Sequence, residues 1–331
     1  RQARAARRLI DSAGEHGIDL DLLWGTVEGA AGRQTVTQSC LAVPAAGRTA
    51  MLFLSAPGAR QGPPGVQQRH LTETVRTALA ELPRAVETPL SIAQALVEPH
   101  HEWALGACRD AGMTWVGRLQ FMQLPWAGTP EPDPAPWPDG VTVRSVTDPT
   151  DFTPGGDGHA LATALERTYA DTLDCPELCG LRSTRDVIDS HMATGRFDPA
   201  RWWIVRLGGE PHGCCLLSHC PTNCALELVY LGVSPALRGQ RLGERLLRHA
   251  LAHANADVRE VTCAVDTRNT PALRLYQSMG FRPFGARVGF VAPLRAASVE
   301  IKVPSALKAG GKGGTLGTSG GQENVAIAKR L

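Results

Sequence analysis

The sequence predicts an α/β protein made of two similar domains. Short apolar runs rich in β-branched residues alternate with segments whose apolar residues recur every three or four positions, as expected for buried strands and amphipathic helices. Sliding the chain by 168 residues superposes two such series without gaps, including Val97 on Val265 and Gly112 on Gly280. Between the two series, residues 126–140 carry a proline at every second position from 130 to 138, which is typical of an extended linker.

The composition is that of an ordinary folded protein. A chain of 331 residues with 43% hydrophobic and 20% charged residues can bury two cores. A net charge of +2 indicates no nucleic-acid-binding surface, and no apolar run has the length of a membrane span. The first twenty residues lack the apolar core of a secretion signal. We therefore expect a cytoplasmic protein without nucleic-acid or membrane partners, and the oligomeric state stays open.

The first predicted domain covers residues 1–125. A helix followed by turns is expected over residues 1–34. After it the pattern predicts strands over 38–43, 49–55, 92–97 and 119–124, and helices over 71–82 and 103–111.

The second predicted domain covers residues 141–297, after the linker at 126–140. Its expected strands are 141–146, 202–207, 214–219, 226–233 and 262–266, and its expected helices are 159–169, 185–193, one from Glu244 and one from Pro271 to Gly280. Residues 298–331 are predicted to form a flexible Gly/Lys-rich tail, because residues 309–321 hold seven glycines in thirteen positions.

A basic, glycine-containing loop follows the strand at 226–233 and precedes a helix. The first amides of a helix have no internal partners, and the helix dipole favours negative charge there. Glycines allow close backbone approach, and arginines add charged donors, so the loop is predicted to hold a pyrophosphate. The residues of this predicted cradle are Arg238, Gly239, Gln240, Arg241, Leu242 and Gly243. The loop alone is equally compatible with a plain turn carrying solvated arginines.

The downstream sequence resembles the GNAT family of acetyl-CoA-dependent N-acetyltransferases. The family's Asn…Ala…Leu-Tyr…Gly-Phe signature is present as Asn269, Ala272, Leu275-Tyr276 and Gly280-Phe281. The family's phosphate loop is commonly Arg/Gln-x-x-Gly-x-Gly/Ala, and Arg238 and Gly243 match its ends while Arg241 replaces the middle glycine. The resemblance covers residues 141–294 and is strongest over 225–285.

This resemblance implies two GNAT-like domains, each a mixed, mostly antiparallel twisted sheet flanked by helices. It implies direct transfer of an acetyl group from acetyl-CoA to a primary amine of a small molecule or protein, in a ternary complex and without a metal. The backbone of Leu231, Gly232 and Val233 is then expected to contact the acetyl group and the pantetheine arm, with a bulge or close approach at Gly232. Asn269 is expected to contact the pantetheine or a strand end, the alternative being a simple turn residue.

Two side chains are candidates for the proton transfers. The resemblance places Tyr276 near the thioester sulfur as the acid, the alternative being that it packs on its helix. Glu227 is the candidate base, acting directly or through water, the alternative being a salt bridge or an edge position. A regular strand would put Glu227 on the same face as Leu231 and Val233. His219 and Asp266 are further candidates.

The first domain lacks the residues that carry this chemistry. Under the 168-residue offset, His101 stands where Asn269 stands and Cys108 where Tyr276 stands. Gly62-Pro63-Pro64-Gly65 takes the place of the phosphate loop, and prolines have no amide N–H to donate. We therefore interpret the first domain as a degenerate GNAT-like unit that is structural or shapes the acceptor pocket. The alternative is an active first domain that uses different residues.

The nine cysteines are predicted to be buried thiols, with zinc binding as the alternative. Two other functions are compatible with the sequence. One is a non-catalytic acyl-CoA sensor, which would bind acetyl-CoA without turnover. The other is an interaction scaffold without a ligand.

Overall fold

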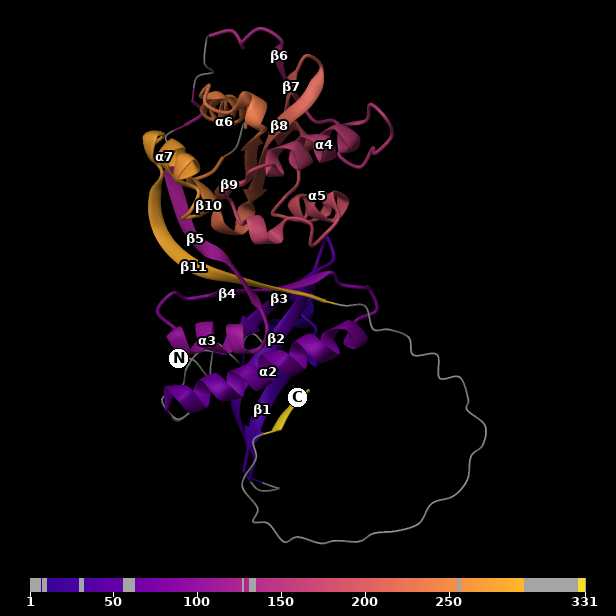
Figure 1. Ribbon diagram of the computed structural model, residues 1–331, viewed down its shortest axis with the longest axis vertical. Coiled ribbons are helices and arrows are strands. Elements are labelled where there is room, and N and C mark those ends of the chain that lie inside the picture. The colour runs from indigo at the N-terminus through magenta and orange to yellow at the C-terminus, as the bar shows by residue number, and fades with distance from the viewer. Residues whose placement is uncertain are drawn as a thin grey trace, which may run out of the picture.

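The chain folds around one continuous sheet of twelve strands. The computed structural model describes residue 7, residues 11–29, 33–55, 63–126, 128–130, 135–254 and 257–294, and the backbone of 327–330. The strand order is β12-β1-β2-β3-β4-β11-β5-β10-β9-β8-β7-β6. Figure 1 shows the long, curved strands β5 and β11 joining a lower half with α2 and α3 to an upper half with α4 to α7.

The elements have the following bounds. The strands are β1 (Leu23–Glu28), β2 (Thr35–Ala45), β3 (Thr49–Leu54), β4 (Ile92–Val97), β5 (Thr114–Pro125), β6 (Val141–Ser145), β7 (Trp202–Leu207), β8 (Glu210–Cys220), β9 (Ala225–Val233), β10 (Glu260–Asp266), β11 (Arg282–Pro293) and β12 (Ile327–Arg330). The helices are α2 (Pro64–Ala85), α3 (Glu102–Asp110), α4 (Asp157–Tyr169), α5 (Thr184–Met192), α6 (Leu242–Ala252) and α7 (Thr270–Ser278), with short 3-10 turns such as η3 (Pro176–Leu178).

The predicted fold class is confirmed. The pairs β3 with β4 and β9 with β10 are parallel, and the remaining neighbours in the sheet are antiparallel. In the N-terminal half, α2 and α3 bury one face of the sheet. In the C-terminal half, α6 and α7 cover one face and α4 and α5 the other. Adjacent Cys214 and Cys215 accordingly lie in different cores, as the alternation of a strand predicts.

Two terminal segments differ from their predictions. The segment predicted as a helix with turns contains strand β1, in which Trp24 is fully buried. The Trp24 Nε1–H donates to Glu81 of α2 at 2.7 Å, so a contact distant in sequence stabilises this strand. Within the predicted tail, Ile327–Arg330 form β12 and pair with β1, while the glycine-rich part lies outside the described residues. Residues 327–330 carry no glycine, unlike the segment at 309–321.

The two halves exchange their last strands. Strand β5 pairs with β10 of the C-terminal half, and β11 pairs with β4 of the N-terminal half. The registers obey the 168-residue offset, because Val97 opposes Val288 and, correspondingly, Val265 opposes Gln120. Between the exchanged strands, Leu119 opposes Arg287, its own equivalent under the same offset. The two copies of the internal repeat are therefore related by a pseudo-two-fold axis, which passes through the pair Leu119 and Arg287. The division of the chain into domains at the linker stays a prediction.

Candidate active site

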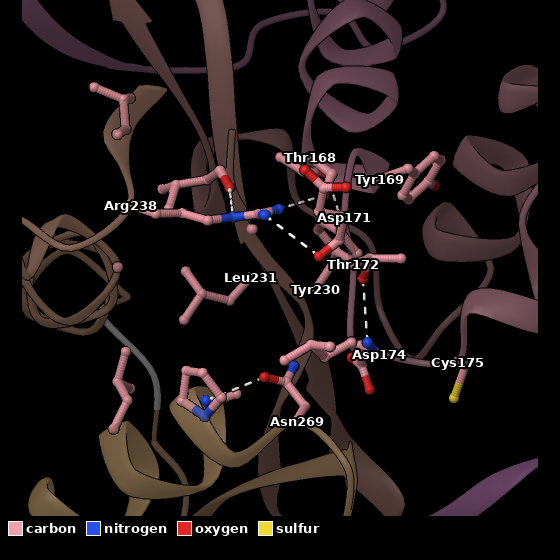
Figure 2. Close-up of a pocket in the computed structure, with 18 of the residues that line it drawn as sticks. Thr168, Tyr169, Asp171, Thr172, Asp174, Cys175, Tyr230, Leu231, Arg238 and Asn269 are labelled. Atoms are coloured by element: carbon pink, nitrogen blue, oxygen red, sulfur yellow. Dashed lines mark hydrogen bonds between the residues drawn. The ribbon is translucent and has the colours of Figure 1, made fainter. Parts of the chain in front are cut away.

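A large cavity opens where β9 and β10 separate. These parallel strands pair only from Ala225 opposite Glu260 to Glu227 opposite Thr262. The cavity has a volume of about 1140 Å³ and lies between β9, the first turns of α6 and α7, and the segment from α4 to α5 (Figure 2). Ten of the predicted site residues line it: Leu231, Gly232, Val233, Arg238, Gly239, Arg241, Leu242, Gly243, Asn269 and Tyr276. Glu227 and Gln240 are not among its lining residues.

The first turn of α6 presents its backbone amides to this cavity. Arg241 is the N-cap of the helix, with φ 57° and ψ 14°, a left-handed conformation that favours glycine. Arg241 therefore keeps the path that the family's middle glycine would give. The first backbone bond of the helix runs from Arg245 N to Arg241 O at 3.2 Å, so the N–H groups of Leu242, Gly243 and Glu244 have no acceptor within the helix. Three free amides at the positive end of a helix are an anion site.

Arg238, predicted to bind the cofactor, makes several hydrogen bonds within the protein. Its guanidinium donates to the carbonyl oxygens of Thr168 at 3.0 Å, Ala170 at 2.8 Å and Asp171 at 3.4 Å, and its Nε–H donates to Val233 O at 3.2 Å (Figure 2). Three of these acceptors lie at the C-terminal end of α4, where carbonyls lack helical partners. Arg238 thus joins the loop before α6 to the end of α4, and its guanidinium N–H groups donate to acceptors within the protein.

We expect Arg238→Ala to destabilise the fold by about 1–2 kcal/mol, since several hydrogen bonds to helix-end carbonyls are lost. The matched control is Arg241→Ala, because Arg241 is exposed and its ion pair among the described residues is with Glu244 of its own helix. Urea unfolding of both variants measures the difference. If Arg238→Ala unfolds like wild type but no longer binds acetyl-CoA, Arg238 is a ligand residue and the structural role is wrong.

A β-bulge in β9 overturns the predicted side-chain alternation. Leu216 opposes Tyr230 and Leu217 opposes Leu228, which leaves Val229 without a cross-strand partner. One extra residue reverses which face the following side chains occupy. The bulge predicted at Gly232 thus lies at Val229 instead.

Glu227 consequently lies on the opposite face of β9 from Leu231 and Val233, so the prediction of a shared face was wrong. Leu231 and Val233 pack with the core of α6 and α7. The Glu227 carboxylate accepts a hydrogen bond from Cys220 Sγ at 3.5 Å. Its predicted role as a base stays a prediction.

The splayed part of β9 directs two backbone amides into the gap. Ser234 N donates to His212 O of β8 at 2.8 Å. Because successive amides of a strand point to opposite sides, the N–H groups of Leu231 and Val233 point away from β8, toward the cavity. Gly232 shows the expected close approach, since a Cβ there would lie 2.8 Å from the Tyr230 ring.

Tyr276 and Asn269 lie on α7 at the cavity. Tyr276 is 6% exposed, packs against Phe281 and has no hydrogen-bond partner among the described residues. Burial raises the pKa of its hydroxyl well above the ordinary value, so Tyr276 keeps its proton. Asn269 caps α7, because its side chain accepts from Ala272 N at 3.2 Å. Asn269 therefore has a structural role whether or not it contacts a ligand.

The opposite side of the cavity is formed by residues 171–192, which we call the α4–α5 wall. Asp174 lines the cavity, and its carboxylate accepts from Asp266 N of β10 at 2.9 Å. Burial among protein atoms raises the pKa of Asp174 above its usual range. Asp266, a candidate base from sequence, is instead fully buried and ion-paired with Arg268 at 2.6 Å.

Tyr230 and His191 complete this side of the cavity. The Tyr230 hydroxyl and Thr168 Oγ1 lie 2.6 Å apart, and the His191 ring packs against Tyr230 with centroids 5.9 Å apart. Burial, followed by the charge of Arg182, lowers the pKa of His191 to about 4, so its ring is neutral near pH 7. No local sequence pattern indicates these residues beyond the placement of the α4–α5 region on the acceptor side, because their proximity depends on the bulge and on loop packing.

The equivalent place in the N-terminal half is closed. Helix α2 begins at Pro64 behind Pro63, and neither proline has an N–H to donate. Gln68 Nε2 donates to Asp110 of α3 at 2.7 Å, and a Cβ on Gly106 would lie 2.6 Å from the Gln68 side chain. The close contact between α2 and α3 supports the view that this half has lost its anion site.

The nine cysteines are free thiols, five of which are buried. Within the described ranges, no group of three or more His, Cys, Asp or Glu side chains is placed to hold a metal. No helix in the part of the chain that the structure describes is both long and apolar enough to span a bilayer.

Comparison with known proteins finds similar sequences and a similar fold. Residues 163–281 match the model of the Acetyltransferase (GNAT) family. A mycothiol acetyltransferase of Thermomonospora curvata is 32% identical over 203 residues, which are 59% of this chain and 64% of that protein. A mycothiol acetyltransferase of Streptomyces avermitilis is 31% identical over 55% of each chain. The chain thus matches roughly half to two thirds of the length of these curated relatives. A crystal structure of a GCN5-related N-acetyltransferase from Sphaerobacter thermophilus has a TM-score of 0.55 at 20% identity, covering 88% of this chain and 86% of that one.

Proposed function

We propose that the protein is an N-acetyltransferase, on the premise that residues 163–281 match the model of the Acetyltransferase (GNAT) family. It would move an acetyl group from acetyl-CoA to a primary amine. The observation that carries this proposal is the set of three free amides in the first turn of α6, which face a cavity large enough for two substrates.

The residues at α6 fit the pyrophosphate of acetyl-CoA. The amides of Leu242, Gly243 and Glu244 can donate to phosphate oxygens, and Gly239, with φ 78°, leaves space beside them. Nothing lies within 4 Å of a Cβ built on Gly239, so the approach to these amides is open on that side. Acetyl-CoA supplies the acetyl group as an activated thioester.

Protein groups further along the cavity have the chemistry that transfer requires. The N–H groups of Leu231 and Val233 would donate to the thioester carbonyl oxygen and the pantetheine arm. Tyr276, which is protonated and without a partner among the described residues, would give its proton to the departing sulfur.

Two carboxylates could take the proton from the acceptor amine. Glu227 lies outside the cavity lining and would act through water, as the sequence suggested. Asp174 lines the cavity and has a raised pKa, which suits a base that must exchange protons near neutral pH. Parallel Glu227→Gln and Asp174→Asn variants separate them, because the true base shifts the acidic limb of the pH–rate profile.

The acceptor that we propose is a small molecule. The curated relatives are named for acetylation in mycothiol chemistry, and the cavity is enclosed by the α4–α5 wall on the acceptor side. A protein amine is the alternative, and it would have to reach into the same enclosed space.

Release of free CoA thiol tests the proposal. Full-length protein is incubated with acetyl-CoA and a panel of amines such as glucosamine, cysteine methyl ester, ethanolamine and a lysine peptide. We expect amine-dependent thiol release with at least one small amine, and product confirmed by mass spectrometry. Acetyl-CoA binding without release on any amine would favour the sensor function, and absence of binding would contradict both.

A further inference from the structure

A turn of the N-terminal half contacts the α4–α5 wall directly. This turn, residues 46–48, joins β2 to β3, and Figure 1 shows the tip of this hairpin reaching α5. The carbonyl oxygen of Gly47 accepts from Arg182 Nη1 at 3.1 Å, and that of Ala46 accepts from the Ser190 hydroxyl at 3.0 Å. Two backbone carbonyls of one half thus hold two side chains of the other.

The contact leaves no space for a side chain at the tip. A Cβ on Gly47 would collide with the carbonyl oxygen of Asp186 and the hydroxyl of Ser190, and it would lie 3.0 Å from Arg182 Nη1. Gly47 also has φ 69°, which favours glycine. Gly112 has φ 90°, and nothing lies within 4 Å of its Cβ position. A substitution at Gly112 therefore introduces the same kind of backbone strain without a collision with α5.

The residues held by the turn belong to the cavity. Arg182 Nη1 also donates to Ser190 Oγ at 2.6 Å, which links the segment before α5 to its last turn. Arg182, Val187 and His191 line the cavity, and His191 follows Ser190 directly. A displacement of α5 at Ser190 would therefore move the side chains that face a substrate.

The loop before α5 is anchored on the same half of the molecule. Cys175, Leu178 and Leu181 pack against three buried side chains of β4, β5 and β11, namely Ile92, Val116 and Val291. Arg268 adds a polar link, because it pairs with Glu177 at 2.7 Å and donates to Val116 O of β5.

We propose that the N-terminal half, closed to a cofactor of its own, acts as the positioning element for the acceptor side of the C-terminal site. The 46–48 turn fixes α5, and the strands at the pseudo-two-fold axis fix the preceding loop. Selection of the amine then depends on both halves, while acetyl-CoA binding depends on the C-terminal half. The inference about selection rests on the acetyltransferase function proposed above.

The test compares Gly47→Val with Gly112→Val in the full chain. Hydrogen–deuterium exchange is measured for peptides covering α5 and α6, acetyl-CoA affinity by calorimetry, and KM for the best amine of the panel by thiol release. For Gly47→Val we expect faster exchange in α5 but not α6, unchanged acetyl-CoA affinity, and a KM for the amine raised about 10- to 100-fold. Gly112→Val should change none of these beyond a uniform loss of stability.

Ser190→Ala is a milder second variant in case Gly47→Val fails to fold. It removes the hydroxyl that accepts from Arg182 and donates to Ala46 O of the turn. We expect it to shift the same readouts in the same direction. Unchanged α5 exchange in both variants would overturn the positioning role. Faster α5 exchange with an unchanged KM would overturn the link to amine selection. If wild-type protein transfers no acetyl group, the proposed function fails, and the exchange data still decide whether the turn holds α5.

Discussion

Tyr276→Phe is expected to lower kcat by about 10²- to 10⁴-fold, the usual contribution of a positioned general acid. The hydroxyl is the only group removed, and it makes no hydrogen bond within the described structure, so the fold loses little. Burial raises the Tyr276 pKa, which keeps the proton on the oxygen until negative charge develops on the departing sulfur beside it. Steady-state thiol release measures kcat, and calorimetry measures acetyl-CoA affinity.

Acetyl-CoA affinity is the internal control for this variant. It should match wild type, since the ring that packs against Phe281 is retained. An equal kcat for Tyr276→Phe and wild type would remove Tyr276 as the acid and leave it as a packing residue of α7. A loss of acetyl-CoA affinity without a loss of kcat would show that Tyr276 contributes to acetyl-CoA binding and not to catalysis.

Gly243→Asp is expected to weaken acetyl-CoA binding by about 10²-fold or more, because like charges about 5 Å apart near a protein surface repel by roughly 3 kcal/mol. Gly243 lies in the first turn of α6, and the closest atom to a Cβ there is Leu275 Cδ1 at 3.4 Å. The substituent therefore fits. A carboxylate at a helix N-terminus stabilises the helix by about 0.3–1 kcal/mol, so lost binding would not reflect unfolding.

Gly243→Asn is the matched control, with the same shape and no charge. It should bind acetyl-CoA far more tightly than Gly243→Asp, and the gap between the two should shrink at high salt. Equal affinities for the two variants would show that no phosphate lies at α6, and the site would then have to be placed elsewhere.

The sequence predicted those parts of the fold that local pattern controls. The β4 bounds agree at both ends, and the helix expected from Pro271 is α7, which begins one residue earlier at Thr270. The helix start after the glycine-containing loop was also predictable, because a helix start and glycines are local features. Arg241 adopts a left-handed conformation that favours glycine, at the position where the family's loop commonly has one.

Features set by contacts distant in sequence were not predictable. Strand β1 is defined by Trp24 packing against α2, and the bulge at Val229 by pairing with β8. The position of Asp174 depends on a loop that packs on three strands. The roles of Arg238 depend on the end of α4, 68 residues earlier in the sequence. The last three of these features concern the site more than the fold, since the site is built where segments from both faces of the sheet meet.

The exchange of β5 and β11 has a consequence for the origin of the chain. The last strand of each copy of the repeat pairs within the sheet of the other copy. A single copy would therefore lack the strand that completes its own sheet. Two identical copies related by a true dyad would satisfy each other at the pair that is now Leu119 and Arg287. The arrangement is that of a symmetric homodimer whose subunits became fused, after which one copy was free to lose its own chemistry and specialise in holding the other.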